Sequence, residues 1–334
     1  MTLVELLTVI LLGSLLLSMV FMLYSSSSRS YIRQGEILEQ TMNLRGGLAN
    51  LSRQLRMAGN GFNLLGLDQG SLVQIYLKDE AGKPTGWFQY PGSAVFGARP
   101  VWGADGGADG PDSITICALA PDFTTTLGSL AIDFTPSQNQ LRLDKTLEVP
   151  TGLDPKEVLK PGDWLALVPL TGHPVLVEAD GDATNLRDIK LKPFPGSFPN
   201  GVLAIASGTP VYNVKTVTLR TYRLDPANNA LLMDSDMVNG DLMAENIEDL
   251  QISYCATGEP GIFSSYSYDL SSIDLVKDPV KAVRVVMSSR ATRPDPYHNK
   301  YQLTPIPSMN RTVYGPADEH MRRQLENVVQ LRNY

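Results

Sequence analysis

One acidic side chain lies inside the apolar N-terminal run of this chain. The chain begins MTLVELLTVILLGSLLLSMVFMLY, and no charged residue follows Glu5 until after Ser28. A carboxylate in an apolar layer is costly and needs a partner. In a bundle of identical helices, a neighbour shifted by about one helical turn, roughly 5.4 Å, would bring the α-amino group of its Met1 to Glu5. The alternative is an incidental acid near a helix N-terminus, where the helix dipole favours it.

Three aspartates, Asp105, Asp109 and Asp112, lie in a glycine-rich stretch that reads GADGGADGPD. Oxygen-rich, glycine-rich loops can hold calcium, although this spacing does not match an EF-hand. Turn chemistry also explains Asp-Gly pairs without any ion. The stretch is therefore interpreted either as a calcium site or as a turn.

The chain has two cysteines, Cys117 and Cys255, and three histidines. No C-x-x-C pair occurs, which argues against zinc clusters and covalently attached haem. In an oxidising compartment the two cysteines could form a disulfide, and the alternative is two buried thiols.

No arrangement typical of catalysis stands out. The sequence has no G-x-S-x-G elbow, no P-loop and no G-x-G-x-x-G after a predicted strand. With 28 basic and 35 acidic residues the formal net charge is −7, which gives no general basic field for nucleic acid. We therefore expect neither an enzyme nor a cofactor-dependent protein.

Residues 1–58 are predicted to form one nearly unbroken helix, because no proline occurs before Pro84. Such a helix would be on the order of 85 Å long, and its apolar part is long enough to span a bilayer. The run lacks the basic start and the cleavage site of a secretory signal, so we expect it to be retained. The small residues Gly13 and Ser14 would let helices approach closely. From Ile32 the pattern becomes amphipathic, with Leu38 and Met42 assigned to the apolar face and Gln40 to the polar face.

The rest of the chain is predicted to be rich in β-structure. Residues 59–245 contain short apolar runs separated by Gly, Pro and Asp clusters, and residues 246–334 contain an alternating strand at 280–287 and a final edge strand. The sequence thus predicts an α+β protein with a long N-terminal helix packed on a large antiparallel head. The head is divided near residue 245 into a β-rich region and a C-terminal part that completes the sheet.

The N-terminus resembles the mature start of type IV pilins and pseudopilins. Thr2, Glu5 and the apolar run from Leu6 match that pattern, whereas Met1 replaces the usual phenylalanine and no proline occurs near position 22. The resemblance implies cleavage by a prepilin peptidase just before Met1 and N-methylation of Met1. Because the proline is missing, any melting of the helix in a filament is expected at Gly13 and Ser14.

Further phrases are similar to those of PilW-like large minor pilins, and next to those of the J-type minor pseudopilins of type II secretion. These phrases are RQLRMAGNGF, GPDSITI, PGDWLALV, ENIEDLQISY, KAVRVVM and RRQLENVVQLRN. The resemblance implies a single-pass inner-membrane protein that joins an extracellular filament with like or other pilin subunits, through an assembly platform in the membrane. Three alternatives stay open: a major or a minor pilus subunit, a minor pseudopilin, or an anchored binding protein that never polymerises.

Overall fold

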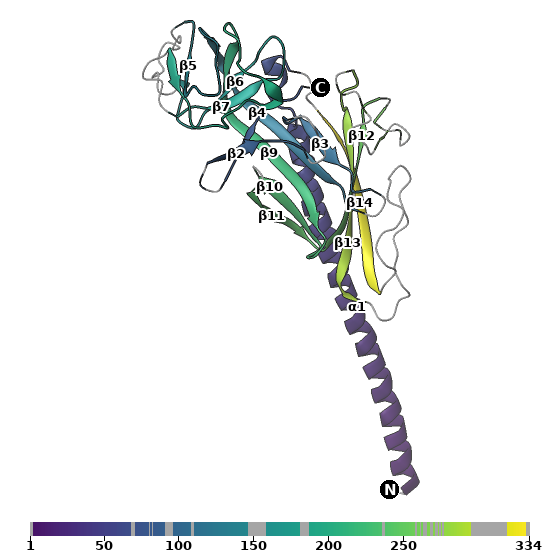
Figure 1. Ribbon diagram of the computed structural model, residues 1–334. Helices are drawn as coiled ribbons and strands as arrows, with labels where there is room; N and C mark the ends of the chain where they lie inside the picture. Colours follow the sequence, from purple (N-terminus) through teal and green to yellow (C-terminus); the bar gives the residue numbers. More distant parts are fainter. Residues whose placement is uncertain are drawn as a thin grey trace.

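The computed structural model shows a long helix that carries a β-rich head at one end (Figure 1). It describes residues 3–331 except 68–70, 80, 82, 91–95, 108–109, 146–157, 181–186, 236–237, 258, 261, 263–265, 268–269, 271–272, 274, 276 and 295–318. Helix α1 runs from Leu3 to Met57 and is 55 residues long, or about 83 Å. It ends where Gly59 adopts a φ of 71° and donates its N–H to the carbonyl of Cys117 at 2.9 Å. The helix therefore ends on the sheet that it packs against.

Two long antiparallel strands, β4 (Ser113–Ser129) and β9 (Pro210–Asp225), form the centre of the larger sheet. Its order is β11-β10-β9-β4-β3, and β6 pairs with the first part of β9 while β7 pairs with β6. The flanking strands are β3 (Val101–Ala104), β6 (Trp164–Leu167), β7 (Val175–Glu178), β10 (Ala230–Ser235) and β11 (Val238–Glu245). Because β9 is so long, one strand ties the region around β6 to the region around the helix.

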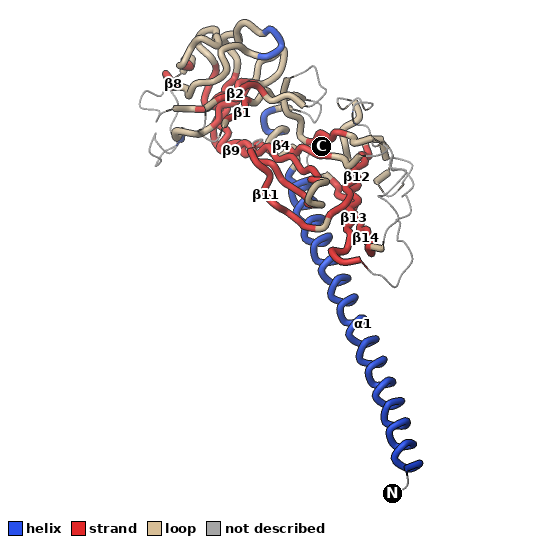
Figure 2. Tube along the Cα trace, turned by 60° about the horizontal axis from the view of Figure 1, so that its bottom comes forward, coloured by secondary structure: helices blue, strands red, loops and turns tan. Residues whose placement is uncertain are grey.

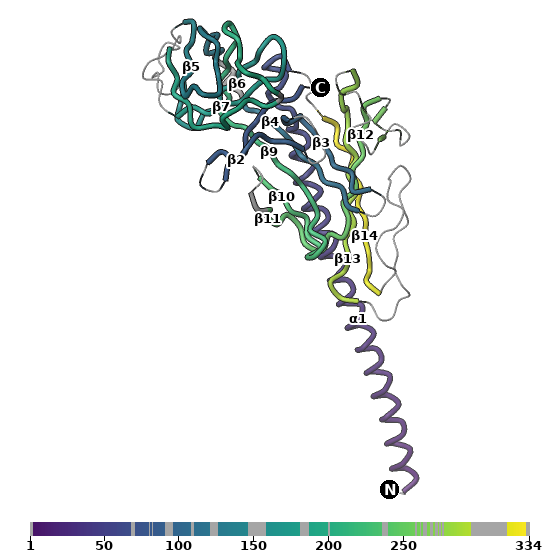
Figure 3. Tube along the Cα trace, in the orientation of Figure 1, coloured from purple at the N-terminus to yellow at the C-terminus, as the bar shows by residue number. Residues whose placement is uncertain are grey.

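A second sheet has the order β12-β13-β14 and is antiparallel throughout. Its strands are β12 (Ile247–Cys255), β13 (Ala282–Pro294) and β14 (His320–Gln330). The chain passes between the two sheets at Asn246, whose φ of 60° lies in the left-handed region. The division of the head near residue 245 stays a prediction. Strand β14 lies alongside the head portion of α1 (Figure 3).

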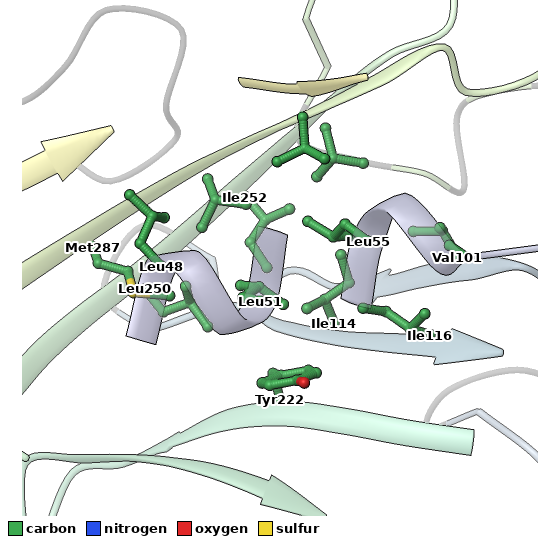
Figure 4. Packing of buried hydrophobic residues seen from close by; sticks show 14 of the residues in the cluster. Leu48, Leu51, Leu55, Val101, Ile114, Ile116, Tyr222, Leu250, Ile252 and Met287 are labelled. Carbon is green, nitrogen blue, oxygen red and sulfur yellow. The ribbon is translucent and has the colours of Figure 1, made fainter. Parts of the chain in front are cut away.

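The upper part of α1 is held between these two sheets. Leu51 and Leu55 are fully buried, with Tyr222 of β9 on one side and Ile252 of β12 on the other (Figure 4). Both glycines of the Gly46-Gly47 pair remain helical. A Cβ added at Gly47 would lie 3.2 Å from the Cβ of Ala244, so the small residue lets the helix approach β11 closely.

Smaller elements complete the head away from the helix. This part of the head has two hydrophobic clusters. One includes Phe134 and Leu165, and the other includes Phe88 and Leu219. The remaining elements are two short pairs and two 3₁₀ turns: β1 (Tyr76–Lys78) with β2 (Pro84–Trp87), β5 (Gln140–Arg142) with β8 (Asp188–Lys190), η1 (Asn63–Leu65) and η2 (Pro199–Gly201). Figure 2 shows this mixture of short strands and loops beyond the end of the helix.

The predicted fold class, α+β with a long N-terminal helix on an antiparallel head, is confirmed. The predicted face of the helix inside the head is partly wrong. Leu38 and Met42 are 61% and 64% exposed, whereas Gln40 is buried and donates from Nε2 to the carbonyl of Met321 at 2.9 Å. The apolar pattern predicts the wrong buried face here because the Gln40 side chain has a hydrogen-bond partner in the backbone of β14. Such a partner cannot be predicted from the apolar pattern alone.

Candidate functional site

The candidate site is the part of α1 that projects from the head. Its large apolar side chains from Leu3 to Tyr24 are all 48–77% exposed. The most apolar 18-residue window of α1 has a mean hydropathy of 2.6, and none of it is buried. By length and composition this helix could cross a membrane. A continuous apolar surface of this size marks a membrane or protein interaction site.

Glu5 lies in the first turn of α1. The Thr8 hydroxyl donates to the carbonyl of Glu5 at 2.9 Å, so the backbone at this acid is part of a regular helix. Met1 and Thr2 lie outside the described residues. The pairing of Glu5 with the Met1 amine of a neighbour, and the methylation of Met1, therefore stay predictions.

Gly13 and Ser14 lie within the regular part of the helix. The Ser14 hydroxyl donates to the carbonyl of Leu11 at 2.8 Å, and no atom lies within 4 Å of a Cβ added at Gly13. The helix is continuous here in the single chain. Because both side chains are small, a second helix can approach the backbone of α1 closely at this point. Their melting inside a filament stays a prediction.

Polar side chains fix the upper part of the helix to β14. Gln40 bonds to the Met321 carbonyl, the Arg323 guanidinium donates to Thr41 Oγ1 at 3.0 Å, and Asn327 donates to Ser52 Oγ at 2.8 Å. These bonds lie along one strand, so they set the axial position of the helix as well as its burial. The head consequently holds its half of α1 in one register. The projecting half leaves its apolar side chains exposed, and only lipid or other chains could cover them.

Asp112 connects the two sheets. Its carboxylate accepts the N–H of Gly106 at 3.0 Å and the N–H of Ile252 at 2.7 Å, and its own N–H donates to the carbonyl of Leu250. Burial is the main reason why the pKa of Asp112 is raised to about 7. The two N–H groups lower this pKa, whereas the charges of Asp105 and Asp249 raise it further. This aspartate therefore acts as a structural link between β12 and the start of β4.

The arrangement of the acidic loop favours the turn interpretation over calcium. Asp105 accepts the N–H of Gly107 at 2.7 Å, as in an Asx turn, and both carboxylate oxygens of Asp112 accept backbone N–H groups. Asp109 lies outside the described residues. Among the residues that the structure describes, no group of three or more His, Cys, Asp or Glu side chains is placed to hold a metal ion.

The two cysteines are buried and are not bonded to each other. Cys117 lies in β4 within the cluster that includes Phe88, whereas Cys255 ends β12 in a small cluster with Tyr266 and Ala282. The structure thus replaces the disulfide alternative with two buried thiols. Sequence separation could not decide this, because the pairing depends on which sheet each strand joins.

The sequence-predicted residues do not converge on one place. Glu5, Gly13 and Ser14 belong to the projecting helix, while Asp105, Asp112 and the two cysteines belong to the head. Met1 and Asp109 lie outside the described residues. The sheet-bridging role of Asp112 was not anticipated. Its position directly before a strand was the available signal, but the partner strand is about 140 residues further along the chain, as the Asp112–Ile252 bond shows.

Comparisons with known proteins place this chain only loosely. No protein-family model matches it, and no curated protein matches it. Among solved structures, the type IV-like pilin TTHA1219 from Thermus thermophilus aligns with 53% of this chain and 89% of its own length, at 12% identity and a TM-score of 0.28. This chain is similar to that pilin at a level that assigns neither a family nor a function.

Proposed function

We propose that this protein is a structural subunit of a type IV pilus-like filament and not an enzyme. The observation that supports the proposal is the projecting half of α1, an apolar helix with Glu5 in its first turn and no burial within the chain. Before assembly the helix sits in the inner membrane as a single span. In the filament it packs among the helices of neighbouring subunits, and the head faces outward.

The physical basis is a transfer of the same apolar surface from lipid to a helix bundle. Lipid and apolar side chains are similarly apolar, so close packing and polar pairing decide the arrangement. Gly13 supplies a place of close approach, and Glu5 supplies a carboxylate whose natural partner is the α-amino group of a neighbour's Met1. Because an unpaired charge in an apolar bundle is costly, this pair would fix the register.

The finer assignment rests on sequence resemblance. The PilW-like phrases favour a minor or priming pilin that is processed by a prepilin peptidase and methylated at Met1. A major subunit and a minor pseudopilin of a type II secretion system are the runner-up assignments within the same class. Electron microscopy of sheared filaments, with mass spectrometry of their bulk component and of Met1, separates them.

The test is the variant Glu5→Ala in cells that make the filament. We expect membrane insertion to persist and incorporation into filaments to fall, because only assembly needs the carboxylate. Glu39→Ala is the matched control, since Glu39 is an exposed acid on the same helix but lies outside the apolar run. Unchanged incorporation of Glu5→Ala would contradict the pairing. A chain that inserts but never appears in filaments would instead be an anchored binding protein.

A further inference from the structure

The two sheets of the head each end in a strand beside α1. Strand β11 is one end of the larger sheet, β14 is one end of the smaller sheet, and α1 contacts both. They lie on opposite sides of the helix (Figures 1 and 2). Within the part of the chain that the structure describes, no strand pairs with the outer edge of either one. Such an edge presents backbone N–H and C=O groups with which another chain can pair.

Strand β14 runs in the same direction as the helix. Its Arg323 bonds to Thr41 of α1, and Asn327, four residues later, bonds to Ser52. The strand therefore advances along the same stretch of α1 that the head covers.

The backbone of β14 is regular enough to pair on its outer edge. Just after the strand, the N–H of Leu331 donates to the carbonyl of Lys281 on the β13 side at 2.9 Å. The pairing of β14 with β13 has no register shift between Gln330 and Arg322. Because successive residues of a strand point their backbone groups to alternate sides, the even-numbered residues of this stretch direct theirs to the outer edge.

Strand β11 runs against the helix, as its neighbours show. The N–H of Gly59 donates to the carbonyl of Cys117, whose partner in β9 is Leu219. Tyr222, three residues further along β9, donates to Oδ1 of Asn50 at 3.4 Å. Strand β9 is therefore antiparallel to α1. Since β10 is antiparallel to β9 and β11 is antiparallel to β10, β11 also runs opposite to the helix.

The two edges lie at a similar height on α1. Ala244 of β11 lies at Gly47, and β14 bonds to the helix at Thr41 and Ser52, on either side of that glycine. Two copies with parallel helices can thus bring β11 of one beside β14 of the other. Because one strand runs against the helix and the other runs with it, the two meet as antiparallel strands.

The side chains of the two edges are complementary. Leu242 of β11 is 55% exposed and Val328 of β14 is 37% exposed, so each edge offers an apolar side chain. Asp241 and Glu245 are exposed acids of β11. In an antiparallel contact the end of β11, with Glu245, meets the beginning of β14, with Arg323. Apolar pairs and pairs of opposite charge across two strands both stabilise a sheet.

The contact between two copies is expected to be short. Register shifts in the pairing of β11 with β10 flank the pairs made by Asp241 and Leu242. Bulges of this kind shorten the ladder that an edge strand can form. A short pair of strands is only marginally stable in water, so the contact requires helices that are already aligned.

We infer that β11 of one copy of this chain pairs antiparallel with β14 of the next copy, so that the sheets continue from head to head. The contact joins two different surfaces, and repeated contacts of that type give an open helical assembly. The inference rests on the proposed function and requires contiguous copies of this chain, as in a major subunit.

The test places one cysteine on each edge, with Leu242→Cys and Val328→Cys in the same chain. Cys117 and Cys255 are buried and should not react. Filaments sheared from cells are treated with a short bismaleimide and separated under denaturing conditions. We expect a ladder of covalent multimers, because each copy is linked to the next through both edges. In the control, Leu203→Cys replaces Val328→Cys at a position that is 86% exposed and outside both strands, and it should give no ladder.

A change of charge tests the same contact without cysteines. Glu245→Arg should lower incorporation into filaments about fivefold, because it brings like charges together where β11 ends and β14 begins. Glu259→Arg changes an exposed acid of the head outside both strands and should have no effect. If the double-cysteine chain does not assemble, this comparison decides, and equal incorporation of the two charge variants overturns the inference.

Two further results would overturn it: filaments that contain the double-cysteine chain without a ladder, and an equal ladder in the Leu203→Cys control. Crosslinks to a different protein, identified by mass spectrometry, would also overturn it, since the edges would then bind another subunit. A wild-type chain that is absent from every filament refutes the proposed function itself. Normal filaments without the ladder refute only the edge contact.

Discussion

The two halves of α1 are one continuous helix in two different environments. Between Leu3 and Tyr24 the large apolar side chains are exposed, and none of the most apolar window is buried. In the head, Leu44, Leu51 and Leu55 of the same helix are fully buried. The N-terminal half of α1 is the more apolar half, and it is also the half that stays exposed. The head is long enough to cover only the other half.

The difference separates folding from assembly. The upper half is fixed by apolar packing between two sheets and by bonds such as that from Gln40 to the Met321 carbonyl. The lower half contributes nothing to the head and depends on lipid or on other chains. Changes in the two halves should therefore affect different measurements.

Leu51→Ala should have the largest effect on folding. Removing a fully buried leucine from a packed cluster costs about 3 to 5 kcal/mol, from lost transfer free energy and from the cavity that remains. The matched change Leu16→Ala removes a side chain that is 62% exposed and should leave the unfolding of the head unchanged. Urea unfolding of both variants, followed by circular dichroism, checks this. Equal losses would show that the two halves do not fold independently.

The pH dependence of the head should follow Asp112. Its pKa of about 7 in the folded chain exceeds the ordinary 3.8, so between those values the folded chain keeps a proton that the unfolded chain releases. The free energy of unfolding should therefore fall as pH rises from about 4 to about 7, by up to roughly 4 kcal/mol, and then level off. The nearby charges of Asp105 and Asp249 add to the effect of burial on Asp112, and burial together with Asp112 and Asp105 also raises the pKa of Tyr254, which stays neutral in this window.

Two variants isolate that effect. Asp112→Asn should flatten the change between pH 4 and pH 7, and should also lower stability throughout, because an amide offers one acceptor where two N–H groups donate. Asp225→Asn should leave this window unchanged, since hydrogen bonds from Asn228 and Ala227 hold the pKa of Asp225 below its usual range. A slope that survives in Asp112→Asn would assign the titration to another group.

Leu16→Arg tests the lower half directly. A charge at the centre of an apolar span costs about 2.5 to 3.5 kcal/mol of insertion, while the head is untouched. We expect less chain in the membrane fraction and an unchanged unfolding midpoint. Gln34→Arg adds the same charge at an exposed position beyond the run and should insert normally. Normal insertion of Leu16→Arg would mean that the run does not span the membrane.

The sequence was most informative where a pattern is local. The long helix follows from the absence of proline before Pro84, and the first half of β13 follows from the alternating run at 280–287. The hairpin from β9 to β10 follows from DPANN, in which Asn229 adopts a φ of 48°. In each of these elements the cause lies within a few residues of the effect.

The sequence was least informative where a partner lies far along the chain. Strand β11 contains Gly240 and has no regular alternation of apolar and polar residues, and it forms because β10 supplies its hydrogen bonds. The burial of Gln40 depends on Met321, and the role of Asp112 depends on Ile252. A groove lined by Arg29 of α1 and by Arg293 at the end of β13 likewise depends on two segments that are far apart in the chain. Such sites arise from packing, which periodicity does not specify.

Gly46→Ala and Gly47→Ala should give the smallest and most closely matched effects. Both replacements favour the helix by up to about 1 kcal/mol. At Gly46 no atom lies within 4 Å of the new Cβ, so the gain should appear as added stability. At Gly47 the Cβ would lie 3.2 Å from that of Ala244 and 3.4 Å from Cδ2 of Leu231, and crowding of this kind costs roughly 1 to 3 kcal/mol. Urea unfolding should therefore show Gly46→Ala above and Gly47→Ala at or below the wild type. The opposite order would mean that the helix and β11 are not in close contact, and that the upper half is held less tightly than the burial of Leu51 indicates.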